Sequence, residues 1–373
     1  MKSNKYEIDM CNGSIMDKLV SFALPLMLSG ILQLMFNAVD IIVVGRFSGS
    51  EALAAVGSTT ALINVFTNLF IGISLGANVL AARFFAAGRK EEMSETVHTS
   101  ITLALISGIL MAFVGLVFSK GALELMGTPE DVIGLSTLYM RIYFMGMPFF
   151  MLYNYGAAIL RAVGDTKRPL YFLIIAGVIN AGLNMVLVIV FGLGVAGVGI
   201  ATVFSQMVSC VLVLTCLCRT EGSYKLSFSK LSMKGYYLKQ IFQVGIPAGI
   251  QSTVINFSNA LLQSSVNSFG STAMAGYTAA NNILGFLYVS INSVTQACMS
   301  FTSQNYGAGN FKRIKKIQIY CVAFVVATGL VLGQGAVFFG NELLRIYSSD
   351  PEVITYGLER LAIISGPYFL CGI

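Results

Sequence analysis

Long apolar runs separated by short polar segments dominate the chain from about residue 19 onward. A helix needs about 20 mostly apolar residues to cross the hydrocarbon core of a bilayer. Ten segments meet this requirement, at residues 19–44, 52–80, 97–118, 132–158, 169–191, 194–218, 240–268, 273–302, 317–340 and 353–373. These segments are too long for the roughly ten-residue alternating strands of a membrane β-barrel. The pattern therefore predicts an all-α polytopic membrane protein that contacts the lipid bilayer over most of its surface.

The composition agrees with the apolar pattern and excludes several classes of protein. Hydrophobic residues make up 56% of the 373 residues, charged residues only 11%, and the mean hydropathy is +0.78. A soluble domain carries about 25% charged residues. The single histidine, His98, has no partners for a metal cluster or a Ser/His/Asp constellation, and the seven cysteines show no paired extracellular spacing. We therefore expect neither an enzyme, nor a cofactor, nor a disulfide framework.

The basic residues predict how the helices are oriented. If the N-terminus is cytoplasmic, the cytoplasmic segments hold 18 of the 23 Lys and Arg residues and the outer loops hold three. Positively charged residues concentrate in cytoplasmic loops. The sequence thus predicts a multi-pass protein of the bacterial inner membrane with its N-terminus in the cytoplasm. The net charge of +6 then orients the protein in the membrane, and no nucleic-acid partner is expected.

The chain also repeats itself with a period near 220 residues. Pro25 corresponds to Pro247 at an offset of 222, and Pro148 corresponds to Pro367 at an offset of 219. Both repeats begin on the cytoplasmic side, and the first contains six predicted helices. The halves are therefore expected to be parallel repeats, which places a substrate cavity between two bundles.

This repeat predicts the domain organisation. The three expected parts are an N-lobe with helices 1–6 at residues 1–218, a cytoplasmic linker at 219–239, and an incomplete C-lobe with helices 7–10 at 240–373. Because the first repeat runs through two more helices than the second, we expect about ten helices of a full set of twelve. The alternative is a natural ten-helix protein.

Three motifs resemble the multidrug and toxic compound extrusion (MATE) family. They are Asn37-Ala-Val-Asp40-Ile-Ile-Val-Val-Gly45-Arg46 in the first helix, Gly164-Asp165-Thr166-Lys167-Arg168-Pro169 after the fourth, and Gly194-Val-Ala-Gly197-Val-Gly-Ile-Ala201-Thr202 in the sixth. The resemblance covers the whole chain. It implies twelve helices in two six-helix lobes. It also implies a secondary antiporter that exports cationic or amphiphilic drugs in exchange for H⁺ or Na⁺ by alternating access.

Asp40 is the only acidic residue inside a predicted span. A carboxylate at that depth costs about 2.5–3.5 kcal/mol on insertion scales, which suggests a function. Ser29, Gln33, Asn37 and Asp40 form one polar stripe on the helix, whereas the position equivalent to Asp40 in the second repeat is Leu262. We hypothesise that a proton or Na⁺ at Asp40 competes with a cationic substrate. The alternative is an interfacial aspartate that reaches the outer headgroups or caps a neighbouring helix.

The resemblance implies polar partners for this acid on helices 4, 5 and 6. The positions that match are Tyr139, Asn154, Asn184 and Thr202, with Asn180 one turn before Asn184. Interhelical hydrogen bonding is the alternative explanation for each buried Asn. One departure from the family is Val188, which stands where H⁺-coupled relatives often carry a second acid. The coupling ion is therefore left open between H⁺ and Na⁺.

Further polar residues at helical spacing are candidates for lining the cavity. They are Gln33, Asn37, Asn64, Asn68, Asn256, Asn259 and Gln263. Interhelical packing contacts are the alternative for the Asn64/Asn68 pair. We expect no metal site apart from Na⁺ at Asp40.

Two rival functions are less well supported by the sequence. A lipid-linked oligosaccharide flippase of the same superfamily must hold a pyrophosphate, which calls for cavity Arg or Lys residues. Apart from Arg141 and Arg360 near the outer helix ends, no span carries a basic residue. A membrane-embedded enzyme or a channel lacks the reactive residues or the subunit repetition it would need. We therefore expect small organic cations or amphiphiles as partners, and a monomer.

Overall fold

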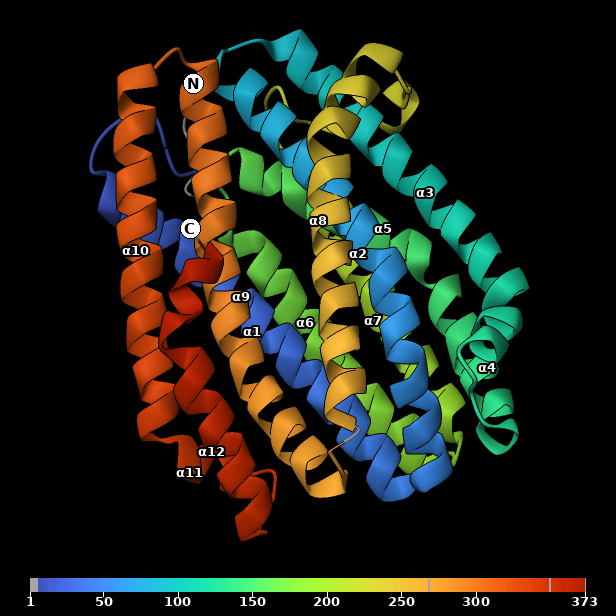
Figure 1. The fold of residues 1–373 in the computed structure, drawn as a ribbon. Coiled ribbons are helices and arrows are strands. Elements are labelled where there is room, and N and C mark those ends of the chain that lie inside the picture. The colour runs from blue at the N-terminus through green and yellow to red at the C-terminus, as the bar shows by residue number, and fades with distance from the viewer. Residues whose placement is uncertain (1–5, 268, 349, 373) are drawn as a thin grey trace. The chain divides into compact units, whose positions relative to one another are not determined.

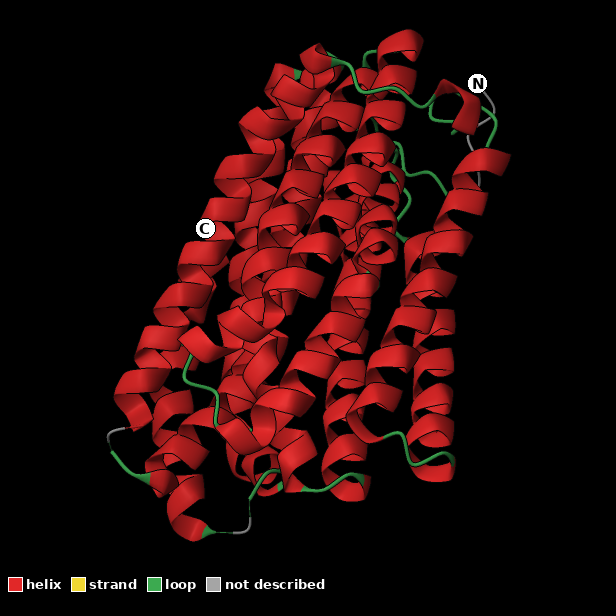
Figure 2. Cartoon of the chain, turned by 90° about the vertical axis from the view of Figure 1, so that its right-hand side faces the viewer, coloured by secondary structure: helices red, strands yellow, loops and turns green. Residues whose placement is uncertain are grey.

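The computed structural model describes residues 6–267, 269–348 and 350–372, and this part of the chain is helical without a strand (Figures 1 and 2). The first repeat contains α1 (Ile15–Phe47), α2 (Ser50–Ala86), α3 (Lys90–Leu125), α4 (Glu130–Met145), α5 (Met147–Ala162), α6 (Lys167–Asn184) and α7 (Gly194–Arg219). The second contains α8 (Gly235–Asn267), α9 (Ser271–Gly307), α10 (Phe311–Phe338), α11 (Gly340–Arg345) and α12 (Pro351–Ser365). Three short elements, η1 (Met185–Val190), η2 (Phe228–Lys230) and η3 (Pro367–Gly372), complete the chain. The all-α prediction is confirmed.

Seven helices in the described residues are long and apolar enough to cross a membrane. They are α1, α2, α3, α6 with η1, α7, α9 and α10. Two of the other predicted spans are interrupted, because α4 gives way to α5 at Gly146 and α12 gives way to η3 at Gly366. The third, α8, has 33 residues, but polar side chains such as Gln251 and Asn256 interrupt its apolar surface.

The two interruptions are corresponding features of the two repeats. Pro148 is the second residue of α5, and Pro367 is the first residue of η3. Proline has no backbone N–H, and its ring clashes with the carbonyl group four residues earlier, so a helix is broken or kinked there. The repeat inferred from the sequence is therefore visible in the local structure.

The chain forms two compact units whose boundaries also follow the repeat. Unit 1 contains the chain up to Ile8 and Leu32–Thr253, and unit 2 contains Asp9–Ile31 and the chain from Val254 onward. The boundaries within α1 and α8 are 222 residues apart, the same offset that relates Pro25 to Pro247. The first parts of α1 and α8 are therefore equivalent segments that belong to different units. The lobe limits at residues 218 and 240 stay a prediction.

Glycine contacts hold the first part of α8 within unit 1. Gly72 and Gly76 of α2 lie directly against Gly249 and Gly245 of α8, and a Cβ atom at any of the four would collide with the facing backbone. Small residues spaced four apart let two membrane helices approach closely. Unit 2 contains similar contacts, where Gly329 and Gly333 of α10 lie against Phe369 and Ser365, and an edge-to-face contact between Phe22 and Phe301 with ring centroids 5.7 Å apart.

Candidate functional site

A buried contact between α1 and α6 forms the centre of the candidate site. Asp40 is only 8% exposed, and Asn184, the last residue of α6, is completely buried. The Asn184 Nδ2 group donates a hydrogen bond to Oδ1 of Asp40. The same amide nitrogen lies 3.3 Å from Oδ1 of Asn180, one turn earlier on α6. The structure thus brings together three of the residues predicted for ion coupling.

Local packing determines this contact. Phe36, one turn before Asp40 on α1, lies against Gly177 of α6 so closely that a Cβ atom at Gly177 would overlap the ring. The two helices can therefore approach only because residue 177 has no side chain. Directly after Asn184 the α-helix changes to the π-helix η1. Such π-turns are rare and often occur at functional sites.

Helices α4 and α7 contribute further polar groups around Asp40. Thr202 on α7 approaches the Asp40 carboxylate, while its hydroxyl donates to the Val198 carbonyl at 2.9 Å. Tyr139 on α4 is buried and lies near Asp40, to which it presents a neutral phenol. Tyr143, one turn further, is also within electrostatic range of Asp40, and its ring centroid is 6.2 Å from that of Tyr139.

The oxygens at this site could hold a proton or a small hard cation. The side-chain Oδ1 of Asn184 is buried and has no hydrogen-bond partner within the described residues. The other oxygens available at the site are those of the Asp40 carboxylate, the Asn180 amide and the Thr202 hydroxyl. Carboxylate, amide and hydroxyl oxygens are the ligands that hard cations prefer. Val188 is buried in η1, so the side chain at this position of the site is apolar.

The other predicted residues have different surroundings in the structure. Asn154 donates its amide to the Phe150 carbonyl of its own helix at 2.8 Å. Among the cavity candidates, Gln33, Asn37, Asn64 and Asn259 are exposed, and Asn68 and Asn256 are half-buried. The side chain of Gln263 lies outside the described residues. Leu262, the repeat equivalent of Asp40, is 56% exposed. The cavity assignments stay predictions.

Sequence reasoning missed Tyr143 and Gln206 as neighbours of the site. The two side chains interact, and Gln206 lies beside Gly146, where the span containing α4 and α5 is interrupted. A sequence signal was present, because Tyr143 follows Tyr139 by four residues and Gln206 follows Thr202 by four. Residues four apart share one face of a helix, so both pairs continue the polar surface that faces Asp40.

Comparison with known proteins identifies the family of this chain. The family model MatE matches residues 25–186 and 247–372, which together make up most of the chain. The chain belongs to the MatE family. The two matched segments begin at Pro25 and Pro247, the pair from which the internal repeat was inferred.

Several relatives of this MatE protein are similar over nearly its whole length. The probable multidrug resistance protein YoeA of Bacillus subtilis is 32% identical over 94% of this chain and 77% of its own. The probable multidrug resistance protein YpnP of the same organism is 29% identical over 98% and 82%. An FAD transporter of Shewanella oneidensis is 24% identical over 95% and 79%.

Solved structures show that this MatE chain has the fold of MATE transporters. A crystal structure of MATE in complex with MaD3S superposes with a TM-score of 0.91 at 22% identity, covering 100% of this chain and 83% of that one. An outward-facing multidrug resistance MATE transporter superposes with a TM-score of 0.90 at 22% identity, covering 98% and 81%.

A second buried acid, Asp165, shows what the Gly164–Pro169 motif of this MatE chain does in the fold. Its Oδ1 accepts the backbone N–H groups of Lys167 and Arg168 at 3.1 and 3.0 Å, which caps the start of α6. Its Oδ2 forms an ion pair with Nε of Arg168. Burial raises the pKa of Asp165, and the hydrogen bonds and charge of Arg168 oppose that shift.

The same motif anchors the N-terminal segment to unit 1. The Ile8 amide donates to the Gly164 carbonyl at 3.3 Å, and the Arg168 guanidinium lies 5.5 Å from the ring centroid of Tyr6. Tyr224 donates its hydroxyl to Glu7 at 2.6 Å; burial and this hydrogen bond raise the pKa of Tyr224 to about 12. The motif therefore has a structural role in this chain, separate from the Asp40 site.

Proposed function

We propose that this protein is a secondary active antiporter that exports cationic or amphiphilic drugs in exchange for H⁺ or Na⁺ by alternating access. The observation that carries the proposal is the buried Asp40 carboxylate, whose contacts in the described residues are all with neutral groups: Asn184, Thr202 and the nearby tyrosines. The printed names of the Bacillus subtilis relatives, both probable multidrug resistance proteins, support drugs as the cargo.

The physical basis is the cost of an unpaired charge away from water. A buried carboxylate with neutral hydrogen-bond donors stays expensive until a cation or proton neutralises it. A cationic drug and the coupling ion can each provide this neutralisation, so they compete for one site. Each exchange then changes the electrostatic free energy of one lobe, and a ligand that binds two conformations unequally shifts their populations.

The choice of coupling ion depends on which oxygens reach Asp40. With Val188 in place of a second acid, two carboxylates cannot share a proton. A single Asp40 can still bind H⁺ directly, or bind Na⁺ with oxygens from Asn180, Asn184 and Thr202. Tyr139 and Asn154 complete the proposed set of coupling residues.

We further propose that the protein lies in the bacterial inner membrane as a monomer with a cytoplasmic N-terminus. The distribution of basic residues supports this orientation. In the proposed arrangement, residues 1–218 form the N-lobe, 219–239 the cytoplasmic linker, and 240–373 belong to the C-lobe. The polar residues predicted to line the cavity contact the drug in this proposal.

Flux measurements in proteoliposomes test the proposal. The purified protein is reconstituted, and ethidium movement is recorded under an imposed pH gradient, an imposed Na⁺ gradient, both, or neither. Ethidium movement driven by one gradient identifies the coupling ion. Gradient-independent movement of a fluorescent lipid-linked oligosaccharide, without ethidium movement, would instead support a flippase. FAD, the cargo named for the Shewanella oneidensis relative, serves as an anionic comparison.

A further inference from the structure

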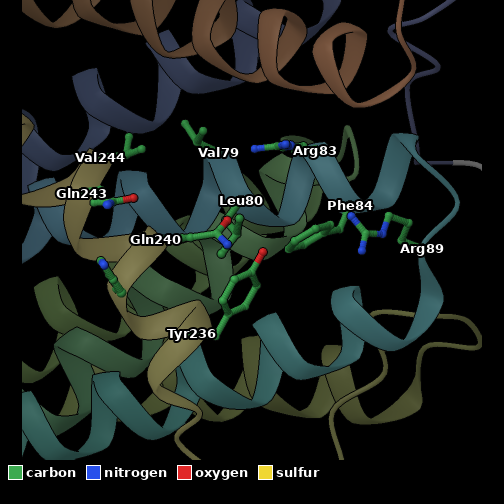
Figure 3. Close-up of a pocket in the computed structure, with 10 residues that line it drawn as sticks. Val79, Leu80, Arg83, Phe84, Arg89, Tyr236, Gln240, Gln243 and Val244 are labelled. Atoms are coloured by element: carbon green, nitrogen blue, oxygen red, sulfur yellow. The ribbon is translucent and has the colours of Figure 1, made fainter.

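A cavity of about 430 Å³ lies between the end of α2 and the start of α8, within unit 1 (Figure 3). Its volume falls in the range typical of ligand sites. Figure 3 shows Tyr236 and Gln240 extending from α8 toward Leu80 and Phe84 of α2. The remaining lining residues are Val79, Arg83, Arg89, Lys239, Gln243 and Val244. This cavity is separate from Asp40, and the proposed transport mechanism does not use it.

The charge of the cavity favours an anion. Arg83, Arg89 and Lys239 line it, all three are exposed, and its lining contains no acidic residue. Arg89 forms an ion pair with Glu92 at 2.5 Å, which balances one of the three positive charges. Tyr236, Gln240 and Gln243 add neutral hydrogen-bond donors. Guanidinium, ammonium, amide and hydroxyl donors together suit a phosphate group.

An apolar groove continues from this cavity along α8. The groove measures about 530 Å³ and is lined by Gly235, Leu238, Lys239, Phe242, Gln243, Ile246 and Pro247. Lys239 and Gln243 line both the cavity and the groove. One end of the combined site is therefore basic and polar, and the other is apolar. A ligand that fills both parts must be amphiphilic, with an anionic head and a hydrocarbon tail.

The helices that form the site are held in position by close packing. The contacts of Gly72 and Gly76 with Gly249 and Gly245 fix where α2 and α8 cross, and the cavity opens one to two turns beyond that crossing. Phe84 is buried, contacts Tyr237 with ring centroids 6.0 Å apart, and lies under the Arg89 guanidinium at 5.2 Å. The Arg89 guanidinium thus lies against a packed aromatic pair.

We propose that this site binds an anionic glycerophospholipid of the cytoplasmic leaflet, with its phosphate in the basic cavity and an acyl chain in the groove along α8. The proposal uses the cytoplasmic orientation of the N-terminus given above, because it places the end of α2 and the start of α8 at the inner surface. That leaflet is rich in anionic lipids, and basic pockets between membrane helices on this side bind their headgroups. A lipid held there would join α2 to α8.

Native mass spectrometry of the full chain in detergent tests the proposal without measuring transport, so its result is independent of the proposed export function. The probes are dioleoylphosphatidylglycerol, dioleoylphosphatidylcholine, glycerol 1-phosphate and inorganic phosphate. We expect the protein to retain phosphatidylglycerol in preference to phosphatidylcholine. The double substitution Arg83→Gln with Lys239→Gln should weaken retention about fivefold for each cation removed, or roughly 25-fold in total.

The matched control is Lys225→Gln with Lys230→Gln, which removes two exposed charges from the linker, outside the cavity lining. It should retain phosphatidylglycerol like the unmodified protein. A second variant, Ile246→Ser, should weaken binding of the dioleoyl lipid but not of its dihexanoyl form. The proposal would be overturned if the cavity variant and the linker variant retained phosphatidylglycerol equally. It would also be overturned if the unmodified protein retained phosphatidylglycerol and phosphatidylcholine equally. Binding of glycerol 1-phosphate or inorganic phosphate as tight as that of the lipid would show a soluble-phosphate site instead.

Discussion

Asp40 and Asp165 are both buried aspartates in unit 1, yet their surroundings differ. Asp165 caps α6 through two backbone N–H groups and forms an ion pair with Arg168. Asp40 accepts a hydrogen bond from Asn184 and approaches Thr202, and no basic side chain of the described residues contacts it. Removing one partner from a buried ion pair is strongly destabilising, so an acid that is paired with a cationic side chain stabilises the fold. An acid whose partners are all neutral can exchange one bound cation for another.

The two sites also differ in how they relate to the internal repeat. Asp40 corresponds to Leu262, which is 56% exposed in the second repeat, so the fold of a repeat does not require an acid there. Asp165 belongs to the contacts that bind Tyr6, Glu7 and Ile8 to unit 1. We therefore expect substitutions at the first site to change transport and substitutions at the second to change stability.

The largest effect is expected for Asp40→Asn. This change removes the charge for which drug and coupling ion compete, so gradient-driven ethidium efflux should fall to the background of empty vesicles. Expression and thermal stability should stay near those of the unmodified protein. Asp17→Asn, which removes an exposed acid from the same helix, is the matched control and should transport normally. Full efflux in Asp40→Asn would show that drug and coupling ion do not compete at this residue.

A large effect on stability is expected for Arg168→Gln. The substitution leaves the completely buried Asp165 without its cationic partner, which should lower the free energy of unfolding by about 3 kcal/mol. Thermal unfolding in detergent measures the change. Lys167→Gln removes an exposed neighbouring charge and should have little effect. If Arg168→Gln lost transport per folded molecule but kept its thermal stability, the ion pair of Asp165 would serve transport and not the stability of the fold.

Asn184→Ala should have an intermediate effect on ion coupling. Hydrogen bonds to charged groups contribute roughly 1.5–3 kcal/mol, so losing the Asn184 amide should change the apparent affinity for the coupling ion about tenfold or more. The amide N–H stabilises the ionised carboxylate. Without it, an H⁺-coupled transporter should reach half-maximal efflux at a pH about one unit higher, because a tenfold change corresponds to one pH unit.

If Na⁺ is the coupling ion, Asn184→Ala should instead raise the half-maximal Na⁺ concentration by a similar factor, because a ligand oxygen is lost. Asn78→Ala is the control, because it removes another buried amide of unit 1, which donates to the Ala158 carbonyl at 2.8 Å. An unchanged pH and Na⁺ dependence in Asn184→Ala would mean that its contact with Asp40 does not affect coupling.

The smallest effect is expected for Thr202→Val. Its hydroxyl approaches Asp40 but already donates to the Val198 carbonyl, so its loss should weaken coupling-ion affinity by roughly threefold, near the lower end of a neutral hydrogen bond. Thr202→Ser keeps the hydroxyl and should behave like the unmodified protein. Equal weakening in both variants would indicate a packing effect of the Thr202 methyl group.

The sequence alone determined the class of fold, the repeat and the candidate acid. The hydrocarbon core of a bilayer strongly disfavours charged residues. The predicted membrane-spanning segments and the one acidic residue within them, Asp40, could therefore be identified from the sequence. Pro148 and Pro367 marked corresponding positions in the two repeats, and the structure places a break in the helical span at each.

Only the tertiary structure decided which polar residues meet. The resemblance implied both Asn154 and Asn184 as partners of Asp40; in the structure the Asn184 amide donates to Asp40 and the Asn154 amide donates to the Phe150 carbonyl of its own helix. The pairing depends on how close two helices come, here on Gly177 against Phe36, and a contact between segments over 140 residues apart leaves no signal in one sequence. For the same reason, the role of Asp165 and the basic cavity between α2 and α8 emerged only when distant segments were brought together.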